Sequence, residues 1–179
     1  MGSRRTISKR FPDLVPAQND SHFLNGFLMN QMDKYYKPDS SVLIIAEPPS
    51  VADIFMGSFE RLTVSVVNYK DDFEGVPFDM NLPIKPSRTY DYVFSQALLE
   101  HICRPSIGIE NMANFARPGG YIFIHSHTPS MAVHKWPYDC VRFLPDFFSC
   151  LQDYLPIELI ESKDIGVDIY AIYRRQEEQ

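Results

Sequence analysis

The sequence predicts an α/β fold in which helices cover both faces of a mostly parallel sheet and the final strand runs antiparallel. From residue 41 to about residue 155, short continuous apolar runs alternate with segments of helical periodicity. This is the pattern of buried parallel strands joined by helices. Two further strand-like runs flank a turn near Asp164 to Gly166, which predicts a terminal hairpin. A chain of 179 residues with 45% hydrophobic residues is long enough to bury one sizeable core.

The elements follow in chain order. We expect residues 1–20 to be a flexible tail and residues 21–179 to form a single domain. Ser21 is the expected N-cap of a helix that ends near Tyr36. "SVLIIA", residues 41–46, is the first buried strand. The other expected elements are helical segments over about 50–59, 98–102, 109–116 and 144–154, strands over 62–67, 90–95 and 121–126, a very short strand in "VPFDM", a sharp turn at Pro118-Gly119-Gly120, and the terminal strands "IELIESK" and "GVDIYAIYRR".

The composition excludes several classes of protein. A formal net charge of −6 argues against nonspecific nucleic-acid binding. No apolar run approaches the roughly 20 residues that a membrane helix needs, and no secretory signal is present, so we expect no membrane partner. The three cysteines lack metal-type spacing, which favours reduced thiols and a cytoplasmic protein.

Three segments of the chain carry a family pattern: "YDYVFSQALLEHICRP", "MANFARPGGYIFIHSHTP" and "HKWPYDCVRFLPDFF". In this order they resemble the small class I S-adenosylmethionine-dependent methyltransferases, and the resemblance spans about residues 41 to 173. The matching positions are Asp91, Glu100-His101, Pro118-Gly119-Gly120, His134, Pro137, Asp139, Arg142 and Phe143. The resemblance implies a Rossmann-like sheet of strand order 3-2-1-4-5-7-6, with S-adenosylmethionine as cofactor at the carboxyl ends of the first strands.

The first cofactor motif of that family is altered. The family has an acidic residue and a glycine-rich loop after the first strand, whereas this chain reads "VLIIAEPPS". Ile44 occupies the acidic position, and Ala46, Pro48 and Ser50 occupy the glycine positions. Prolines remove backbone N–H donors and fix φ, so the usual close backbone cradle is not expected. Glu47 is the substitute carboxylate for the amino group of the cofactor.

The second motif is altered as well. The family ends its second strand with an acid that binds both ribose hydroxyls, and Asn68 stands there in this chain. Asp79, in "FDMNLP", matches the family segment near the adenine. Together with Gln96, which ends the strand "YDYVFSQ", the expected cofactor contacts are Glu47, Asn68, Asp79 and Gln96.

The stretch "YIFIHSHTPSMAVHKWPYDCVRF" concentrates histidines behind a strand. Metal binding, catalysis, substrate binding and core packing all fit its composition. The spacing matches no common zinc pattern, so we predict no metal site. His134 is the predicted general base, since the near-neutral pKa of histidine suits proton removal. The predicted substrate contacts are His101, His127, Trp136, Asp139 and Arg142.

Two interpretations compete for part of this stretch. Asp139 and Arg142 either hold a polar substrate or pair with each other to fix the loop, with Trp136 packed as a cover. His125 is either part of the pocket rim or buried beside the sheet with its ring merely hydrogen bonded.

The leading functional hypothesis is a methyltransferase that acts on a hydroxyl or amine of a small molecule, such as a sugar or another metabolite. The alternative is a methyltransferase-fold protein that has lost the cofactor and serves as a binding or scaffold module, as the altered glycine loop suggests. A hydrolase or a metal enzyme remains a third option. The short segment between residues 68 and 90 leaves one flank thinly covered, so a homodimer or a protein partner is left open.

Overall fold

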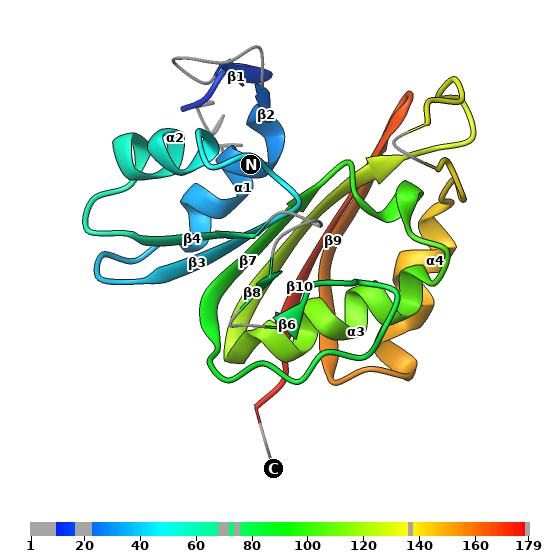
Figure 1. Ribbon diagram of the computed structural model, residues 1–179. Coiled ribbons are helices and arrows are strands. Elements are labelled where there is room, and N and C mark those ends of the chain that lie inside the picture. Colours follow the sequence, from blue (N-terminus) through cyan, green and yellow to red (C-terminus); the bar gives the residue numbers. More distant parts are fainter. Residues whose placement is uncertain (1–9, 17–22, 68–71, 74–75, 136–137, 178–179) are drawn as a thin grey trace, which may run out of the picture.

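The computed structural model describes residues 10–16, 23–67, 72–73, 76–135 and 138–177, and its centre is a six-stranded sheet with helices on both faces (Figure 1). The strand order is β4-β3-β7-β8-β10-β9. The sheet strands are β3 (Ser41–Ile45), β4 (Thr63–Val67), β7 (Tyr90–Gln96), β8 (Ala116–His127), β9 (Ile157–Ile165) and β10 (Asp168–Arg175). The α-helices are α1 (Gly26–Tyr35), α2 (Val51–Ser58), α3 (Pro105–Phe115) and α4 (Pro145–Cys150).

The pairing of the strands confirms the predicted topology of the central sheet. β4, β3, β7 and β8 are parallel, and β3 lies next to β7, as predicted for the "SVLIIA" and "YDYVFS" strands. β10 is antiparallel to both β8 and β9, which confirms the antiparallel end of the sheet. Two one-turn 3₁₀ helices, Leu99–His101 and Leu151–Asp153, replace parts of the expected helical segments.

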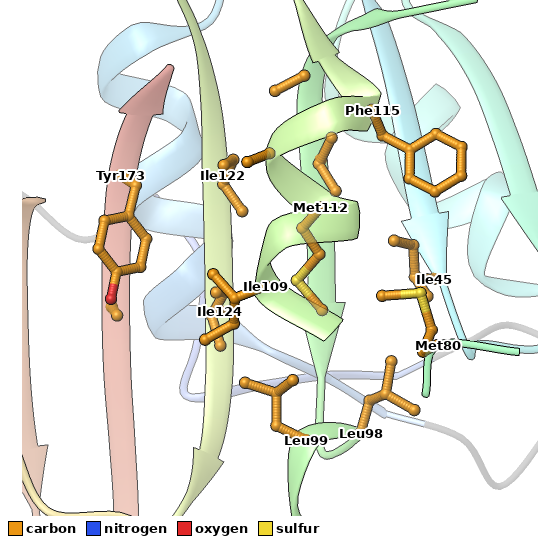
Figure 2. Close-up of a cluster of buried hydrophobic side chains, with 14 of the residues drawn as sticks. Ile45, Met80, Leu98, Leu99, Ile109, Met112, Phe115, Ile122, Ile124 and Tyr173 are labelled. Atoms are coloured by element: carbon orange, nitrogen blue, oxygen red, sulfur yellow. The ribbon is translucent and has the colours of Figure 1, made fainter. Parts of the chain in front are cut away.

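Apolar side chains from the two faces of the sheet form two cores. On one face, α3 packs on β8, with Ile109 and Met112 against Ile122 and Ile124 (Figure 2). On the other face, buried side chains of α1 and α2 cover the apolar side of β3 and its neighbours. Burial on both faces explains why the central strands read as continuous apolar runs. Among the described residues, no helix is long and apolar enough to cross a membrane.

The expected third strand does not join the central sheet. Val76–Pro77 forms the short strand β6, which pairs with β5 (Asp72–Phe73) in a separate two-stranded unit. The expected order 3-2-1-4-5-7-6 is therefore wrong at its first position, and β4 is an edge strand in the described part of the sheet. The physical reason is composition: prolines at 77, 83 and 86 each lack the N–H that a ladder requires.

Residues 10–16, the described part of the segment expected to be a flexible tail, contact the rest of the fold. β1 (Leu14–Pro16) pairs antiparallel with β2 (Phe23–Asn25), and Phe11 is buried with its ring centroid 5.8 Å from that of Phe59. The first helix begins later than expected because Asn25 is the N-cap, with Oδ1 accepting from two backbone N–H groups. Ser21, the expected N-cap, lies outside the described residues.

The segment Pro118-Gly119-Gly120 is part of β8 rather than a turn before it. α3 ends at Phe115 and β8 starts at once, with a register shift against β7 between Tyr90 and Tyr92. Gly119 has φ of +74°. A Cβ on Gly120 would lie 2.9 to 3.2 Å from three backbone carbonyl oxygens. The glycines therefore allow an irregular strand start pressed against β7.

Asp91 at the start of β7 has a structural role. Its Oδ2 accepts hydrogen bonds from the Ser41 backbone N–H at 2.8 Å and the Ser41 hydroxyl at 2.9 Å, and its Oδ1 pairs with Arg117 at 2.6 Å. Partial burial opposes ionisation, but these hydrogen bonds hold the pKa of Asp91 below its usual range. The contacts tie together the amino ends of β3, β7 and β8.

We expect Gly120→Ala to destabilise the fold by about 1–3 kcal/mol, because the new methyl group overpacks rigid backbone. Urea denaturation would measure the change. Gly57→Ala in α2 is the matched control: nothing lies within 4 Å of its added Cβ, and helix propensity predicts a gain of up to about 1 kcal/mol. Equal stabilities for the two variants would contradict the tight contact at Gly120.

Candidate active site

The candidate site lies at the carboxyl edge of the sheet, where open α/β folds bind ligands. The helical turn that follows β7 and the loop that follows β8 meet at this edge (Figure 1). The carbonyl of Glu100 in the turn accepts hydrogen bonds from the backbone N–H groups of Cys140 at 2.7 Å and Val141 at 3.3 Å. These two bonds hold the loop after β8 against the helical turn after β7.

Glu100 is the centre of the site. Its side chain is 0% exposed. Its Oε2 accepts a hydrogen bond of 2.7 Å from the Ser126 hydroxyl on β8, whereas its Oε1 accepts none in the described structure. A buried carboxylate oxygen without a donor is costly, because the protein has removed its water without replacing it. The environment of Oε1 therefore requires explanation.

Three imidazole rings surround this oxygen. The Nε2 atoms of His127, His134 and His101 lie 3.2, 3.8 and 3.9 Å from Glu100 Oε1. The rings meet edge to face, with centroids 5.1 Å apart for His101 and His134 and 5.2 Å apart for His127 and His134. His127 is nearly buried, and the His134 side chain is 37% exposed.

The opposite nitrogen identifies the tautomer of two of the rings. For His101 and His134, Nδ1 contacts a backbone carbonyl, which can only accept, so Nδ1 carries the proton in the neutral ring, whereas both ring nitrogens of His127 lie 3.2 Å from a carboxylate oxygen. The oxygens that face Nδ1 are the Asp168 carboxylate for His127 at 3.2 Å, the Ala132 carbonyl for His134 at 3.3 Å and the Tyr138 carbonyl for His101 at 2.5 Å. In these tautomers the Nε2 atoms of His101 and His134 carry no proton, and both lie within 3.9 Å of Glu100 Oε1.

A second cluster of polar side chains, formed by His125, His127 and Asp168, shares His127 with the cluster around Glu100. Asp168, the first residue of β10, also accepts from His125 Nε2 at 2.9 Å. This hydrogen bond is the main reason that the pKa of Asp168 lies below its usual range. Burial lowers the pKa of His127, with His125 and His134 adding to the effect and Glu100 and Asp168 opposing it. Burial therefore favours the neutral form of the His127 ring.

Both groups have the composition of metal ligands. Glu100, His127 and His134 place one potential ligand atom each within 4.8 Å of one another, and so do His125, His127 and Asp168. The sequence-based prediction of no metal site relied on spacing along the chain. The fold brings Glu100 and Asp168 to the histidines from distant segments, which chain spacing does not reveal.

Asp139 and Arg142 pair with each other. Arg142 donates to both oxygens of the Asp139 carboxyl, which is held at a pKa of about 2 mainly by these hydrogen bonds. Asp139 also accepts from the backbone N–H of His134 at 2.7 Å, and Arg142 donates to the Ala132 carbonyl at 3.1 Å. The geometry matches the loop-fixing interpretation of the pair, which positions His134.

The loop after β3, where the family resemblance places the cofactor, keeps one backbone feature of a glycine-rich loop. Ala46, at the first glycine position of the family, has φ of +65°, and its N–H donates to the Val67 carbonyl at 2.7 Å. A glycine-like turn is thus made by alanine, at a cost of about 1–2 kcal/mol in backbone strain. The next residue, Glu47, is 2% exposed, and burial raises its pKa to about 8.

Two of the other expected cofactor contacts, Gln96 and Asp79, form hydrogen bonds within the protein. Gln96 Oε1 accepts from the backbone N–H of Asn25 at 2.7 Å. Asp79 Oδ1 accepts from the backbone and side chain of Asn81 at 2.9 and 3.0 Å, which closes a turn. Asn68 and Trp136 lie outside the described residues. The structure thus gathers the predicted substrate contacts more tightly than the predicted cofactor contacts.

Sequence reasoning missed part of the cluster. The sequence indicates Glu100 only as part of the Glu100-His101 pair and predicts no role for it, and nothing in the local sequence points to Asp168. The signal for Asp168 is the register of the last strand, since Asp168 pairs directly with His127 across β8 and β10. Cys103 and Cys140 are free thiols beside this cluster, with 3.3 Å between their sulfur atoms.

A separate pocket of about 390 Å³ lies at the amino edge of the sheet. Its lining includes Lys37, Asp91 and Arg117. Asp91 and Arg117 are already paired and fix strand ends, and no histidine is among the described residues that line the pocket. The candidate base and the other histidines of the described chain lie instead at the carboxyl edge.

Comparisons with solved structures identify the fold. An S-adenosylmethionine-dependent methyltransferase from Clostridium acetobutylicum gives a TM-score of 0.63 at 8% identity, over 84% of this chain and 89% of that one. One from Aquifex aeolicus gives 0.60 at 12% identity, over 83% and 89%. A chain from a complex between the Haloferax volcanii Trm112 methyltransferase activator and a methyltransferase gives 0.61 at 11% identity, over 85% and 95%.

The chain thus has the Rossmann-like fold of class I S-adenosylmethionine-dependent methyltransferases. No family model matches the chain, and no curated protein matches it. At identities of 8–12%, these likenesses establish the fold alone.

Glu47→Gln should flatten the pH dependence of stability. The unfolded chain loses the Glu47 proton near pH 4.5, while the folded chain keeps it until about pH 8. The folded state binds more protons between these values, so this group lowers the free energy of unfolding as pH rises, by up to about 1.4 kcal/mol per pH unit. Thermal melts of both proteins from pH 4 to 9 would measure the difference. Parallel curves would contradict a buried, neutral Glu47.

Proposed function

We propose that this protein is an S-adenosylmethionine-dependent methyltransferase that methylates a hydroxyl or amine of a small molecule, such as a sugar or another metabolite. The observation that carries the proposal is the histidine cluster around Glu100, which lies at the ligand-binding edge of a methyltransferase fold. A small acceptor suits the site because its polar groups are few, closely spaced and mostly buried.

The donor would lie over the carboxyl ends of β3 and β4. The residues proposed to hold it are Glu47, Asn68, Asp79 and Gln96. The left-handed backbone of Ala46 supports this placement, because it keeps the turn that a glycine-rich loop would form. When bound, S-adenosylmethionine supplies an electrophilic methyl group on a cationic sulfur. The prolines at 48 and 49 offer no N–H donors, so affinity should be weak.

His134 is proposed to remove the proton of the acceptor. Its Nδ1 faces the Ala132 carbonyl, which leaves the Nε2 lone pair available. When the acceptor oxygen or nitrogen takes the methyl group that the donor would supply, S-adenosylhomocysteine would leave and the acceptor proton would pass to His134 Nε2. Glu100 Oε1, 3.8 Å away, would stabilise the resulting imidazolium. Most of the rate would come from positioning, since methyl transfer is an in-line displacement.

The remaining predicted contacts take supporting roles in this proposal. His101 and His127 line the same cluster and would contact polar groups of the acceptor. Asp139 and Arg142 would hold the loop that carries His134, and their mutual pair leaves them less available for substrate than predicted from sequence. The Haloferax volcanii complex supports a protein partner as a further proposal, because its Trm112 component is described as a methyltransferase activator.

The alternative function is a binding or scaffold module that no longer binds the cofactor. Two observations favour it: the prolines in the β3–α2 loop and the local engagement of Asp79 and Gln96. Calorimetry with S-adenosylmethionine and S-adenosylhomocysteine separates the two functions. Saturable heat supports the methyltransferase, whereas no heat and no thermal shift at millimolar ligand would favour the module.

Replacing Pro48 and Ser50 with glycine should tighten S-adenosylmethionine binding, because the first change restores an N–H donor and both restore backbone freedom near the donor. Calorimetry of the double variant beside the parent protein measures the gain. Gly57→Ala in the adjacent helix serves as the control for indirect effects on α2. An unchanged affinity in the double variant would mean that the donor binds elsewhere or not at all.

His134→Ala should lower turnover by about 10²- to 10⁴-fold, the usual contribution of a general base, and leave S-adenosylmethionine affinity unchanged. The loop should persist because the backbone N–H of residue 134 still donates to Asp139. Methyl transfer to a panel of hydroxyl and amine acceptors gives the rate, and exposed Lys135→Ala is the neighbouring control. Full turnover in His134→Ala would remove the residue from the mechanism.

A further inference from the structure

Three imidazole rings surround Glu100 Oε1, and yet this buried oxygen has no hydrogen-bond donor in the described structure. Oε1 is an acceptor, and the Nε2 atoms of His101 and His134 are acceptors in the tautomers that their Nδ1 contacts define. One proton between Glu100 and His127 would satisfy the 3.2 Å contact. It would leave the lone pairs at 3.8 and 3.9 Å facing the same oxygen without a donor.

We propose that Glu100, His127 and His134 bind a divalent first-row transition-metal ion, with the His101 ring beside the site. A cation between the three ligands would satisfy a lone pair on each of them at once. It would also account for the buried Oε1, which has no hydrogen-bond donor in the described structure. The site is distinct from the methyl-donor position over β3 and β4, and it goes beyond the proposed methyl transfer.

The distances are close to those that a bound ion requires. Metal–ligand bonds of about 2.0–2.2 Å to imidazole nitrogen and carboxylate oxygen place neighbouring ligand atoms about 3.0–3.5 Å apart. The contact between Glu100 Oε1 and His127 Nε2 is 3.2 Å, and the contact with His134 Nε2 is 3.8 Å. His134 is on a half-exposed loop, so a small loop movement would close the remaining gap.

The outer contacts of these side chains are those that orient metal ligands. A ligating histidine donates its second ring N–H to a carboxylate or a carbonyl, which fixes the tautomer and the ring plane. His127 makes such a contact with Asp168, and His134 makes one with Ala132. Glu100 Oε2 is fixed by the Ser126 hydroxyl, so Oε1 points to the cluster. The ligands are thus held in place before any ion binds.

The donor types define the class of ion. Imidazole nitrogens suit zinc, iron, copper and nickel, whereas calcium and magnesium prefer sites made wholly of oxygen. Neither described ligand group includes a thiolate, which argues against copper(I) and iron–sulfur clusters. Two histidines and one carboxylate leave coordination positions for an external ligand. The site therefore has the form of a catalytic rather than a structural metal site.

The ion would change the role of His134 in the proposed reaction. In the metal-loaded protein, His134 Nε2 would be a ligand, and an acceptor hydroxyl bound to the ion would release its proton to solvent water near neutral pH because the metal lowers its pKa. His134 is the base only in the metal-free protein. The metal site stands without methyl transfer, so the two proposals can fail separately.

Calorimetric titration of the chelator-treated full chain with Zn²⁺ tests the site, and Co²⁺ titration followed by visible absorption reports the ligand geometry. We expect one ion per chain. Asp168→Asn should weaken binding by about 10- to 100-fold, as loss of an outer contact does, and His134→Ala and Glu100→Gln should weaken it further. Exposed Glu158→Gln is the matched control for Glu100→Gln and should bind normally.

Three results would overturn the proposal. The first is that neither ion binds the parent protein. The second is that His134→Ala, confirmed as folded by its thermal melt, binds like the parent protein. The third is that His125→Asn abolishes binding while His134→Ala does not, which would place the ion between His125, His127 and Asp168. Metal binding without methyl transfer under any condition would sink the proposed function and leave the metal site intact.

Discussion

The buried carboxylate of Glu100 is the constraint on which the rest of the candidate site depends. Removing a carboxylate from water is costly, so neighbouring groups must compensate. Ser126 donates to one oxygen, and three imidazoles surround the other. The Glu100 backbone carbonyl also anchors the loop after β8. A single residue after β7 thus determines where the loop lies and which atoms face each other beneath it.

Sheet topology explains how such a site arises from distant segments. Parallel β7 and β8 place Glu100 and His127 at the same edge of the sheet. The antiparallel register of β8 and β10 adds Asp168 directly opposite His127. Each ring is then oriented by an oxygen on its far side. The methyl donor is proposed to bind beside the loop after β3. Ala46 keeps the turn of a glycine-rich loop there, but the prolines that follow offer no backbone N–H groups.

The sequence was most informative where local chemistry decides the structure. Apolar runs and helical spacing predicted the central strands, their parallel direction and the closing hairpin, because burial on both faces leaves a continuous pattern, whereas the order of the strands came from the family resemblance. The sequence did not predict the features that depend on strand pairing or on contacts between distant segments. Prolines kept the "VPFDM" segment out of the sheet, and β1 pairing drew residues 14–16 into the fold. His134 was found from its position after a strand, but Asp168 required the strand register.

The central claim is that His101 and His134 direct Nε2 lone pairs at Glu100 Oε1. Nitrogen-15 NMR of the ring nitrogens in the metal-free protein measures this directly, because protonated and bare ring nitrogens resonate at different frequencies. The account predicts Nδ1-protonated neutral rings for His101 and His134, with the Nε2 signal of His134 changing when Zn²⁺ is added. Nε2-protonated rings, or imidazolium rings paired with the Glu100 carboxylate at neutral pH, would contradict it.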